Sequence, residues 1–494
     1  MAIPVIDLFA GPGGLNEGFS RVGESEGEPQ FETVGSFEME TSAVNTLILR
    51  GTYRHLLRKG GVPDSYYEYI RGQITWDEFL RDERVAQALE ASKSHVHQVE
   101  LGGKDDDSEN LIRTALTSAG VLNTGKPWVL IGGPPCQAYS LAGRSRRAKD
   151  ETFATDKKHF LYREYLRILA AFAPPIFVME NVKGMLSSTS GGGRIFEKIK
   201  SDLESPGDAK YSLHSLVVDR QSDELIPRDF VIQSELYGVP QRRHRVIIVG
   251  IRADLLSVRG SFPQLKAKKK VVSLAEALTG MPKLRSGISP SSRDGYEDWA
   301  RVLAEASGSS KIAPSAGEPR LTRGSRAMKR EGKPKGGLAS WLLDPKLDDV
   351  LQHESRGHMT SDLKRYRFAA ERAATTKASP RLSDFPTDLQ PNHKNAGADG
   401  HPFEDRFRVQ LAGKPSTTIV SHIAKDGHYY IHPDPDQMRS LTVREAARLQ
   451  TFPDNYLFSG NRTQQYHQVG NAVPPLLAFQ IAQLVSGLLA VPDN

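Results

Sequence analysis

Short apolar runs that alternate with helix-like stretches are the feature of this sequence that most constrains its fold. Six such runs occupy residues 4–9, 31–37, 128–131, 176–179, 212–218 and 246–251. Short strands joined by helical segments are typical of a parallel sheet with helices on both faces. The pattern therefore predicts an α/β fold with a doubly wound sheet, whose first helix lies around residues 15–22.

Two long stretches interrupt this alternation. Residues 51–126 are long and polar for one connection in such a sheet, and we expect a helical insertion whose clearest helix is GQITWDEFLRDERVAQALEAS. Between residues 261 and 430, Gly, Ser, Pro and basic residues dominate, and a helical period stands out only near residues 347–374. This composition favours a smaller, loop-rich second domain.

The end of the chain regains a helical pattern. Periodicity resumes at Thr442, in TVREAARLQTF, and a further helix is expected to begin at Pro475. We therefore divide the chain into a first domain over 1–260, a second domain over 261–430, and a C-terminal segment, 431–494, that returns to the first domain.

The apolar segments and the cysteine content of the 494-residue chain indicate its cellular compartment. The N-terminal MAIPVIDLFAGPGG lacks the pattern of a signal peptide. The apolar stretch 476–491 is interrupted by Gln480, Gln483 and Ser486, which favours a packed helix over a membrane span. A single cysteine excludes an intrachain disulfide and favours a reducing cytoplasm. We expect no metal and no membrane association.

The formal charge of +6 indicates a polyanionic partner only weakly. Basic residues gather in two clusters of the predicted second domain. The first holds Lys266, Lys268, Lys269 and Lys270, and the second holds Arg320, Arg323, Arg326, Lys329, Arg330, Lys333 and Lys335. Such runs are often solvated loops, so a solvated loop and a nucleic-acid contact both stay open at this point.

A glycine-rich turn follows the first predicted strand. DLFAGPGGLNEGF places Gly11, Gly13 and Gly14 where a strand ends and a helix begins, which permits close approach of a ligand to helix N–H groups. Glu38, at the end of the second strand, can accept both hydroxyls of a ribose. Asn16 stands where a dinucleotide fingerprint has its third glycine. The loop therefore suits an adenosine-type ligand without a pyrophosphate; a turn that binds no ligand is the alternative.

The only cysteine, Cys136, lies directly after the predicted strand WVLI, in GGPPCQ. Binding residues of α/β sheets collect at the carboxyl ends of strands, and two prolines stiffen this turn. A lone cysteine is more often a small buried hydrophobic residue. Its position at the exit of a strand favours a nucleophile instead.

Two further segments place polar side chains at strand ends. The strand IFVM ends in Glu180, which can serve as an acid or hydrogen-bond partner opposite the thiol, although many strands end in an ordinary Glu. QRRHR, ahead of VIIVGI, holds Arg242, Arg243 and Arg245, which can bind phosphate and a base. A solvated hairpin is the alternative for this second segment.

Taken together, these segments resemble the DNA cytosine-5 methyltransferase family. DLFAGPGG resembles its cofactor loop, PPCQ its nucleophile motif, ENV its cytosine-binding acid and QRRHR its arginine motif, while RSLTVREAARLQTFPD and QVGNAVPP resemble its last two motifs. The six segments occur in the order usual for the family, from residue 7 to residue 475. The resemblance implies a Rossmann-like methyltransferase sheet, with a target-recognition domain in the variable segment.

The resemblance also implies the chemistry. The target cytosine is flipped out of double-stranded DNA, and the Cys136 thiolate attacks its C6 atom. Glu180 holds N3, C5 receives the methyl group of S-adenosylmethionine, and the C5 proton is lost. Arg243 and Arg245 are expected to hold the base and nearby phosphates, and their positive field favours the thiolate.

By the same resemblance, the roles of the remaining site residues can be assigned. The cofactor is expected to contact Asp7, Phe9, Gly11, Gly13, Gly14, Leu15, Glu38, Pro134, Asn471 and Val473. Phe9 should stack near the adenine, while Asn471 and Val473 should close the methionine end. DNA is expected to contact Gln137, Ser140, Arg144, Arg146, Arg147, Thr417 and Thr418. The family reads sequence with its variable segment, which favours DNA contact by the two basic clusters.

Some features depart from the family pattern or lie outside it. The acidic residue that contacts the adenine amino group in the third motif is not evident, and Glu100 is only a weak candidate. The insertion could contact DNA or a partner. Because the first motif begins at Asp7, we expect a compact prokaryotic modification enzyme without an N-terminal regulatory region. Such an enzyme would be monomeric and would act with a restriction system or another anti-phage system, whose proteins are possible partners.

Two other hypotheses stay open. A catalytically idle relative would bind DNA or a partner complex without methylating, although the intact Cys136, Glu180 and cofactor loop argue against it. A relative that methylates RNA cytosine shares most of the motifs, and the long variable segment favours duplex DNA over RNA. The sequence does not give the recognised DNA site, because base contacts in that segment follow no transferable code.

Overall fold

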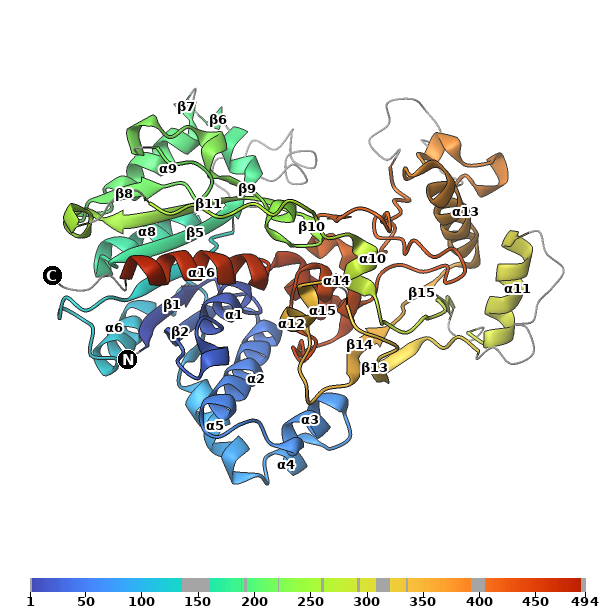
Figure 1. The fold of residues 1–494 in the computed structure, drawn as a ribbon, viewed down its shortest axis with the longest axis horizontal. Helices are drawn as coiled ribbons and strands as arrows, with labels where there is room; N and C mark the ends of the chain where they lie inside the picture. The colour runs from blue at the N-terminus through green and yellow to red at the C-terminus, as the bar shows by residue number, and fades with distance from the viewer. Residues whose placement is uncertain are drawn as a thin grey trace.

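The computed structural model describes residues 2–135, 160–187, 189–190, 193–220, 222–258, 262–290, 294–307, 320–334, 336–391 and 405–489. A central sheet with helices on both faces forms one part of the molecule, and short strands and helices of the second half of the chain form the other (Figure 1). Helices α14 (Val443–Leu449) and α15 (Arg462–Asn471) lie between these two parts.

The central sheet has the strand order β3-β2-β1-β4-β5-β11-β8, and β9 also pairs with β11. Its strands are β1 (Ile3–Leu8), β2 (Phe31–Glu38), β3 (Val96–Gln98), β4 (Val129–Gly132), β5 (Ile176–Val182), β8 (Tyr211–His214), β9 (Val231–Gln233) and β11 (His244–Arg252). The strands from β3 to β5 in this order are parallel, so the predicted doubly wound α/β sheet is confirmed.

Strand β11 runs antiparallel to both β5 and β8, whereas the sequence pattern predicted a parallel sheet throughout. A parallel connection needs a crossover, usually a helix. The chain between β8 and β11 instead carries the short strand β9, the two-residue strand β10 (Gln241–Arg242) and 3-10 turns, so it returns without a crossover helix. This reversal brings the arginine motif, at the start of β11, to the carboxyl end of β5.

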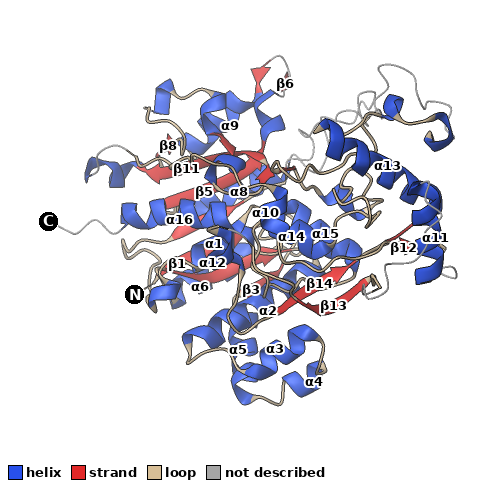
Figure 2. Ribbon diagram, turned by 45° about the vertical axis from the view of Figure 1, so that its right-hand side comes forward, coloured by secondary structure: helices blue, strands red, loops and turns tan. Residues whose placement is uncertain are grey.

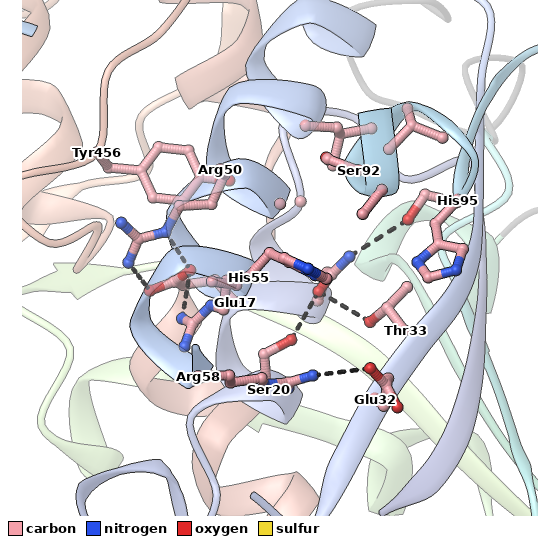
Figure 3. Close-up of a pocket in the computed structure, with 18 residues that line it drawn as sticks. Glu17, Ser20, Glu32, Thr33, Arg50, His55, Arg58, Ser92, His95 and Tyr456 are labelled. Carbon is pink, nitrogen blue, oxygen red and sulfur yellow. Dashed lines mark hydrogen bonds and ion pairs between the residues drawn. The ribbon is translucent and has the colours of Figure 1, made fainter. Parts of the chain in front are cut away.

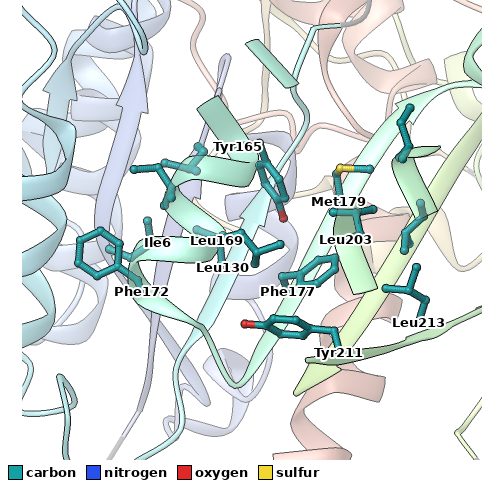
Figure 4. Close-up of a cluster of buried hydrophobic side chains, with 14 of the residues drawn as sticks. Ile6, Leu130, Tyr165, Leu169, Phe172, Phe177, Met179, Leu203, Tyr211 and Leu213 are labelled. Carbon is teal, nitrogen blue, oxygen red and sulfur yellow. The ribbon is translucent and has the colours of Figure 1, made fainter. Parts of the chain in front are cut away.

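Side chains alternate between the two faces of the sheet. Val178 faces α1 (Gly14–Ser20) and α16 (Pro475–Leu489), while Phe177 faces α6 (Ser108–Ser118), α8 (Phe160–Phe172) and α9 (Ile195–Glu204). Figure 4 shows the second cluster, where Phe177 and Met179 of β5 meet Tyr165 and Leu169 of α8. Both faces of the sheet are therefore covered by buried apolar side chains, and we expect functional groups at the edge where the strands end.

The apolar C-terminal helix belongs to this core. The segment Arg462–Leu489 is apolar enough to cross a membrane, but 61% of its most apolar stretch is buried inside the molecule. Leu477, Ile481 and Val485 of α16 pack against the sheet. This burial fits the predicted packed helix.

Residues 51–126, the predicted insertion, contain the last turns of α2 (Thr41–Arg58), followed by α3 (Asp64–Arg71), α4 (Trp76–Phe79), α5 (Glu83–Lys93), β3 and α6. The single helix predicted over residues 72–92 is wrong. Thr75 accepts a hydrogen bond from Glu78 N and Asp82 accepts one from Arg84 N, and each of these caps begins a separate helix.

Between β11 and α14 the chain forms mostly short elements. They are α10 (Leu274–Leu278), β12 (Gly287–Ile288), α11 (Tyr296–Ser307), β13 (Gly324–Lys329), α12 (Leu338–Leu342), β14 (Asp349–Glu354), β15 (Gly357–His358), α13 (Thr360–Thr376) and β16 (Ser416–Thr417). Strand pairs β6 (Thr189–Ser190) with β7 (Gly193–Arg194), β12 with β15, β13 with β14 and β10 with β16 each form a small sheet. The helical pattern predicted near residues 347–374 is wrong over its first part, where strand β14 lies, and helix α13 follows from Thr360.

The insertion packs against the β13–β14 ribbon (Figures 1 and 2). Arg71 of α3 forms an ion pair with Asp349 at 2.6 Å, and the hydroxyl of Tyr67 donates to Asp344 at 2.7 Å. Arg326 of β13 donates to Tyr69 O at 2.8 Å. The insertion therefore contacts the chain around Asp344 and the β13–β14 ribbon through these polar side chains.

Candidate active site

The glycine loop between β1 and α1 has the backbone that its sequence predicts. Gly11 and Gly13 have φ angles of +54° and +88°, which side chains disfavour. A Cβ at Gly11 would meet no atom within 4 Å, so the space beside this residue is open. A Cβ at Gly14 would lie 2.2 Å from Val473 O, which places the QVGNAVPP segment directly against the loop.

Glu38 lies at the end of β2, beside the loop. Gly11 N donates to its Oε2 atom at 2.8 Å, and Met39 N and Glu40 N donate to its Oε1 atom at 2.9 Å. Burial raises the pKa of Glu38 in spite of these hydrogen bonds. The carboxylate is thus fixed in position at the edge of the open space by Gly11.

Asp7 and Phe9 flank the same turn. Asp7 is buried, its Oδ2 atom has no hydrogen-bond partner, and burial with the nearby charge of Glu38 raises its pKa well above its usual range. Phe9, which has a φ of +54°, is half-buried at the exit of β1. Leu15, by contrast, packs into the core beneath the sheet.

Asn16 is held by hydrogen bonds to α1 and β2. Its side chain donates to Ser36 Oγ at 3.3 Å and accepts from Thr33 and Ser20 at 3.0 and 2.9 Å. These residues line a cavity of about 120 Å³ between α1, α2 and β2, which Gly13 of the loop and Arg50 also line (Figure 3). Asn16 therefore holds α1 to β2 at the position where a dinucleotide fingerprint has glycine.

At the next strands, the turn after β4 meets the end of β5. Asn181 Nδ2 donates to Pro134 O at 3.2 Å, and a Cβ at Gly133 would lie 3.0 Å from Glu180 Oε2. The Glu180 carboxylate therefore lies against the turn that leads into Cys136. Cys136 itself, with Gln137, Ser140, Arg144, Arg146 and Arg147, lies outside the described residues.

Glu180 has a cationic partner from β11. Arg245 Nε lies 2.9 Å from Glu180 Oε1, and the two side chains are 13% and 12% exposed. Burial lowers the pKa of Arg245, while Glu180 opposes this effect. The ion pair fixes the orientation of the carboxylate, and both side chains are largely withdrawn from water.

Arg243 is a fully buried side chain two residues earlier. It donates to Ile419 O at 2.8 Å, and burial together with the charge of Arg245 lowers its pKa well below the usual value. Thr418 Oγ1 donates to Arg242 O at 2.6 Å, and β16, which contains Thr417, pairs with β10. The structure thus joins the arginine motif to the two threonines that the sequence assigned to DNA contact.

The remaining expected site residues take different positions. Val473 is buried against the glycine loop, whereas Asn471 is exposed at the end of α15. Glu100 is exposed two residues beyond β3, on the same edge of the sheet. Of these three residues, Val473 makes the closest approach to the loop.

The two basic clusters differ from one another. Lys266, Lys268 and Lys269 are exposed. In the second cluster, Arg323 pairs with Asp294 at 2.7 Å, and Arg330 is buried between Asp348 and Asp454. Much of the second cluster therefore stabilises the fold.

Sequence reasoning missed two residues that organise the site. Gln241, which is fully buried, donates to Leu449 O and Gln450 Oε1, and its Oε1 atom accepts from Ile419 N at 2.6 Å. Arg448 forms a buried bidentate ion pair with Asp454. Gln241 was visible as the first letter of QRRHR, but its partners lie more than 170 residues away and leave no local pattern.

Comparison with known proteins agrees with this geometry. A crystal structure described as an E. coli DNA modification methyltransferase encoded within a prophage superposes with a TM-score of 0.55, at 19% identity, over 99% of this chain and 100% of that one. The family model for C-5 cytosine-specific DNA methylase matches residues 114–486.

Sequence relatives extend the match over the chain. The Type II methyltransferase M.Bpa9945I of Bacillus paralicheniformis is 33% identical over 98% of this chain and 99% of its own length. The DNA (cytosine-5-)-methyltransferase M.ApeKI of Aeropyrum pernix is 27% identical over 73% of this chain and 81% of its own.

The sheet, with its glycine loop and acidic strand ends, defines an α/β methyltransferase fold. The chain belongs to the C-5 cytosine-specific DNA methylase family. It is therefore a DNA (cytosine-5-)-methyltransferase.

Proposed function

We propose that the protein methylates C5 of a cytosine that it flips out of double-stranded DNA, with Cys136 as nucleophile and Glu180 and Arg245 as the groups that hold the base. One observation carries the proposal: the Glu180–Arg245 ion pair of 2.9 Å lies at the carboxyl end of β5, against the turn that leads into Cys136. A base inside the duplex is stacked, so a pocket at the edge of the sheet can act on it only after flipping.

In this pocket, the Cys136 thiolate adds to C6 and leaves an electron pair at C5, which makes C5 the nucleophile. Glu180, when its carboxyl group carries a proton, donates a hydrogen bond to N3, and Arg245 keeps the carboxyl group oriented toward it. After C5 has gained a methyl group, a water molecule takes up the C5 proton, and the electron pair of the C5–H bond restores the double bond as the C6–S bond breaks. The thiolate then leaves, and the enzyme is regenerated.

The residues of the glycine loop fit S-adenosylmethionine. The open space beside Gly11, the fixed carboxylate of Glu38 and the unpartnered Oδ2 atom of Asp7 meet at one edge of the sheet. Glu38 would accept the ribose hydroxyls, and Val473 would close the other end. When bound, the cofactor supplies an electrophilic methyl group.

Thr417 and Thr418 would seat the DNA, because the arginine motif holds them beside the pocket. Gln137, Ser140, Arg144, Arg146 and Arg147 would contact DNA from the segment that follows Cys136. We further propose that the protein acts in the cytoplasm as the modification enzyme of a restriction system or another anti-phage system, since relatives are named type II methyltransferases.

The test is expression in a host without cytosine-5 methylation, followed by genome-wide mapping of 5-methylcytosine. We expect one methylated sequence motif in the wild type, none in Cys136→Ala, and a loss of at least a hundredfold in Glu180→Gln, in line with the usual effect of a positioned acid. Glu90→Gln, at an exposed carboxylate with an ion pair to Lys93, is the matched control and should methylate normally.

A duplex carrying 5-fluorocytosine in the motif should trap wild-type protein covalently through Cys136, because the C5 fluorine cannot leave as a proton does. Tight DNA binding without methylation would instead establish an idle relative. Methylation of RNA alone would establish the third hypothesis. Either result would refute the proposal.

A further inference from the structure

The segment that carries Thr417 and Thr418 is anchored on two sides. Arg243 and Gln241 hold its Ile419 end to the catalytic part of the chain. On the other side, Gln410 Oε1 accepts from Thr417 N at 2.9 Å, and Gln410 Nε2 donates to Tyr429 O at 2.8 Å. The chain around Gln410 is therefore the next layer outward from the base pocket.

This layer has two faces. Phe407 and Val409 are buried in an apolar cluster with Ile431. Because side chains of an extended chain alternate, Arg408 shares the face of Gln410, which is turned toward Thr417. Hydrogen bonds from Arg408 N to His428 O and from Ile431 N to Arg408 O keep the backbone extended here.

Arg408 lies within electrostatic reach of the pocket. Tyr430 donates its hydroxyl to Thr418 O at 3.0 Å. Burial raises the pKa of this hydroxyl to about 12, and the positive charges of both Arg243 and Arg408 act against that shift. The charges of Arg408 and of Arg243 therefore both act on Tyr430, the residue that bonds the Thr418 carbonyl.

The guanidinium of Arg408 is both exposed and oriented. It forms an ion pair with Asp405, and the two side chains are 37% and 47% exposed. Arg406 has a looser carboxylate partner, Asp426, at 3.9 Å. A carboxylate partner reduces the net charge that a phosphate would attract, but it fixes the direction of the guanidinium fork, which is what recognition of a base edge needs.

We propose that Arg408, oriented by Asp405, reads the O6 and N7 atoms of a guanine in the target sequence, other than the partner of the flipped cytosine. Guanine is the base that presents two acceptors side by side in the major groove, and a guanidinium fork matches them. The inference rests on the proposed function, since it needs DNA at the pocket.

The test compares Arg408→Lys and Asp405→Asn with the wild type. Lysine keeps the charge but loses the fork, and asparagine removes only the orienting charge. Arg301→Lys is the matched control, because Arg301 and Asp298 also form an exposed i,i+3 ion pair, at 3.1 Å, but on α11 at the outer end of the molecule (Figure 1).

Methylation rates are measured on duplexes that carry the wild-type motif and each of its single-base substitutions. We expect both variants to lose roughly tenfold to a hundredfold of their preference at one guanine position, with the other positions unchanged. The Arg301→Lys variant should match the wild type at every position.

Several results would overturn the inference. A uniform loss on all duplexes with a weaker salt dependence would show a phosphate contact instead. An unchanged preference, or a wild-type motif without a further guanine, would also refute it. If Arg408→Lys failed to fold in thermal melting, Asp405→Asn alone would decide. Absence of methylation by the wild type would refute the proposed function itself. Failure of the proposed function is thereby distinguished from failure of the inference about Arg408.

Discussion

Helices α1 and α16 approach so closely that one methyl group should disrupt the cofactor loop. A Cβ at Gly18 would lie 2.4 Å from Ala478 Cβ and 2.4 Å from Phe479 N. Carbon atoms in contact prefer about 3.5–4.0 Å, so in Gly18→Ala the two helices must separate by about 1 Å or more. The obstructing atoms belong to the backbone and to a Cβ, and no side-chain rotation can remove them.

The separation has a cost that can be estimated. Overpacking of a core costs about 1–3 kcal/mol, and we expect the upper end, about 3 kcal/mol, because α16 also packs on the sheet through Ile481 and Val485. The start of α16 follows Val473, whose carbonyl backs Gly14 of the loop. Gly18→Ala should therefore also weaken binding of S-adenosylhomocysteine.

Urea unfolding gives the free energy of unfolding, and calorimetric titration gives the ligand affinity. The matched control is Gly487→Ala, an exposed position of α16 where a Cβ would meet no atom within 4 Å. There the helix should gain about 0.5 kcal/mol from the better helix former. A free energy of unfolding for Gly18→Ala within about 0.5 kcal/mol of the wild type would refute the reasoning, since surface substitutions already vary by that much.

Three further predictions concern polar side chains that hold parts of the chain together. Arg243→Met should keep the fold, because burying this guanidinium is costly, but it should lower methylation at least tenfold by releasing Ile419 O. A normal methylation rate would contradict a role for the Arg243–Ile419 hydrogen bond. His353 is buried with a pKa lowered by burial to about 4, so the unfolded state binds more protons between pH 4 and 6.5. This residue should therefore contribute a loss of stability on the order of 1 kcal/mol from pH 7.5 to 5.5. His353→Gln should lose less in urea unfolding over that range, and an equal loss would argue against the prediction. Arg71→Ala should lower stability by about 1–2 kcal/mol through Asp349 while methylation at saturating DNA stays unchanged, as measured by melting and rate together.

The strands of the central sheet were predictable because each carries its own signal. Runs such as PVIDL and VIIVGI are buried on both faces, so nearly every residue must be apolar. Strand β3 is only Val96–Gln98, with two polar residues, and offers no such run. The direction of β11 depends on the path between strands rather than on its own residues, so the sequence pattern could not indicate it.

The contacts of the candidate site likewise divide into some that the sequence predicted and others that it could not. The glycine loop and Glu38 form a local unit, since both follow strands that are neighbours in the sheet, and the sequence predicted their proximity. The tie between Arg243 and Ile419 joins residues 176 positions apart, and no spacing rule anticipates it. The ion pair of Arg245 with Glu180 required β11 to run antiparallel to β5, which the sequence pattern did not predict.

Basic residues in this chain show why charge counts say little about nucleic-acid contact. Arg444 donates to three backbone carbonyl oxygens, of Leu351, Pro453 and Tyr456, and it is fully buried. Arg50 joins Glu17 of α1 to Asn455, whose amide donates to Asp344 at 2.7 Å. Arg50 therefore links α1 to the chain around Asn455, and Arg444 holds the chain around Tyr456 to β14. A cationic side chain that can read DNA must instead be exposed and oriented, and Arg408 meets both conditions where Arg50 and Arg444 meet only the second.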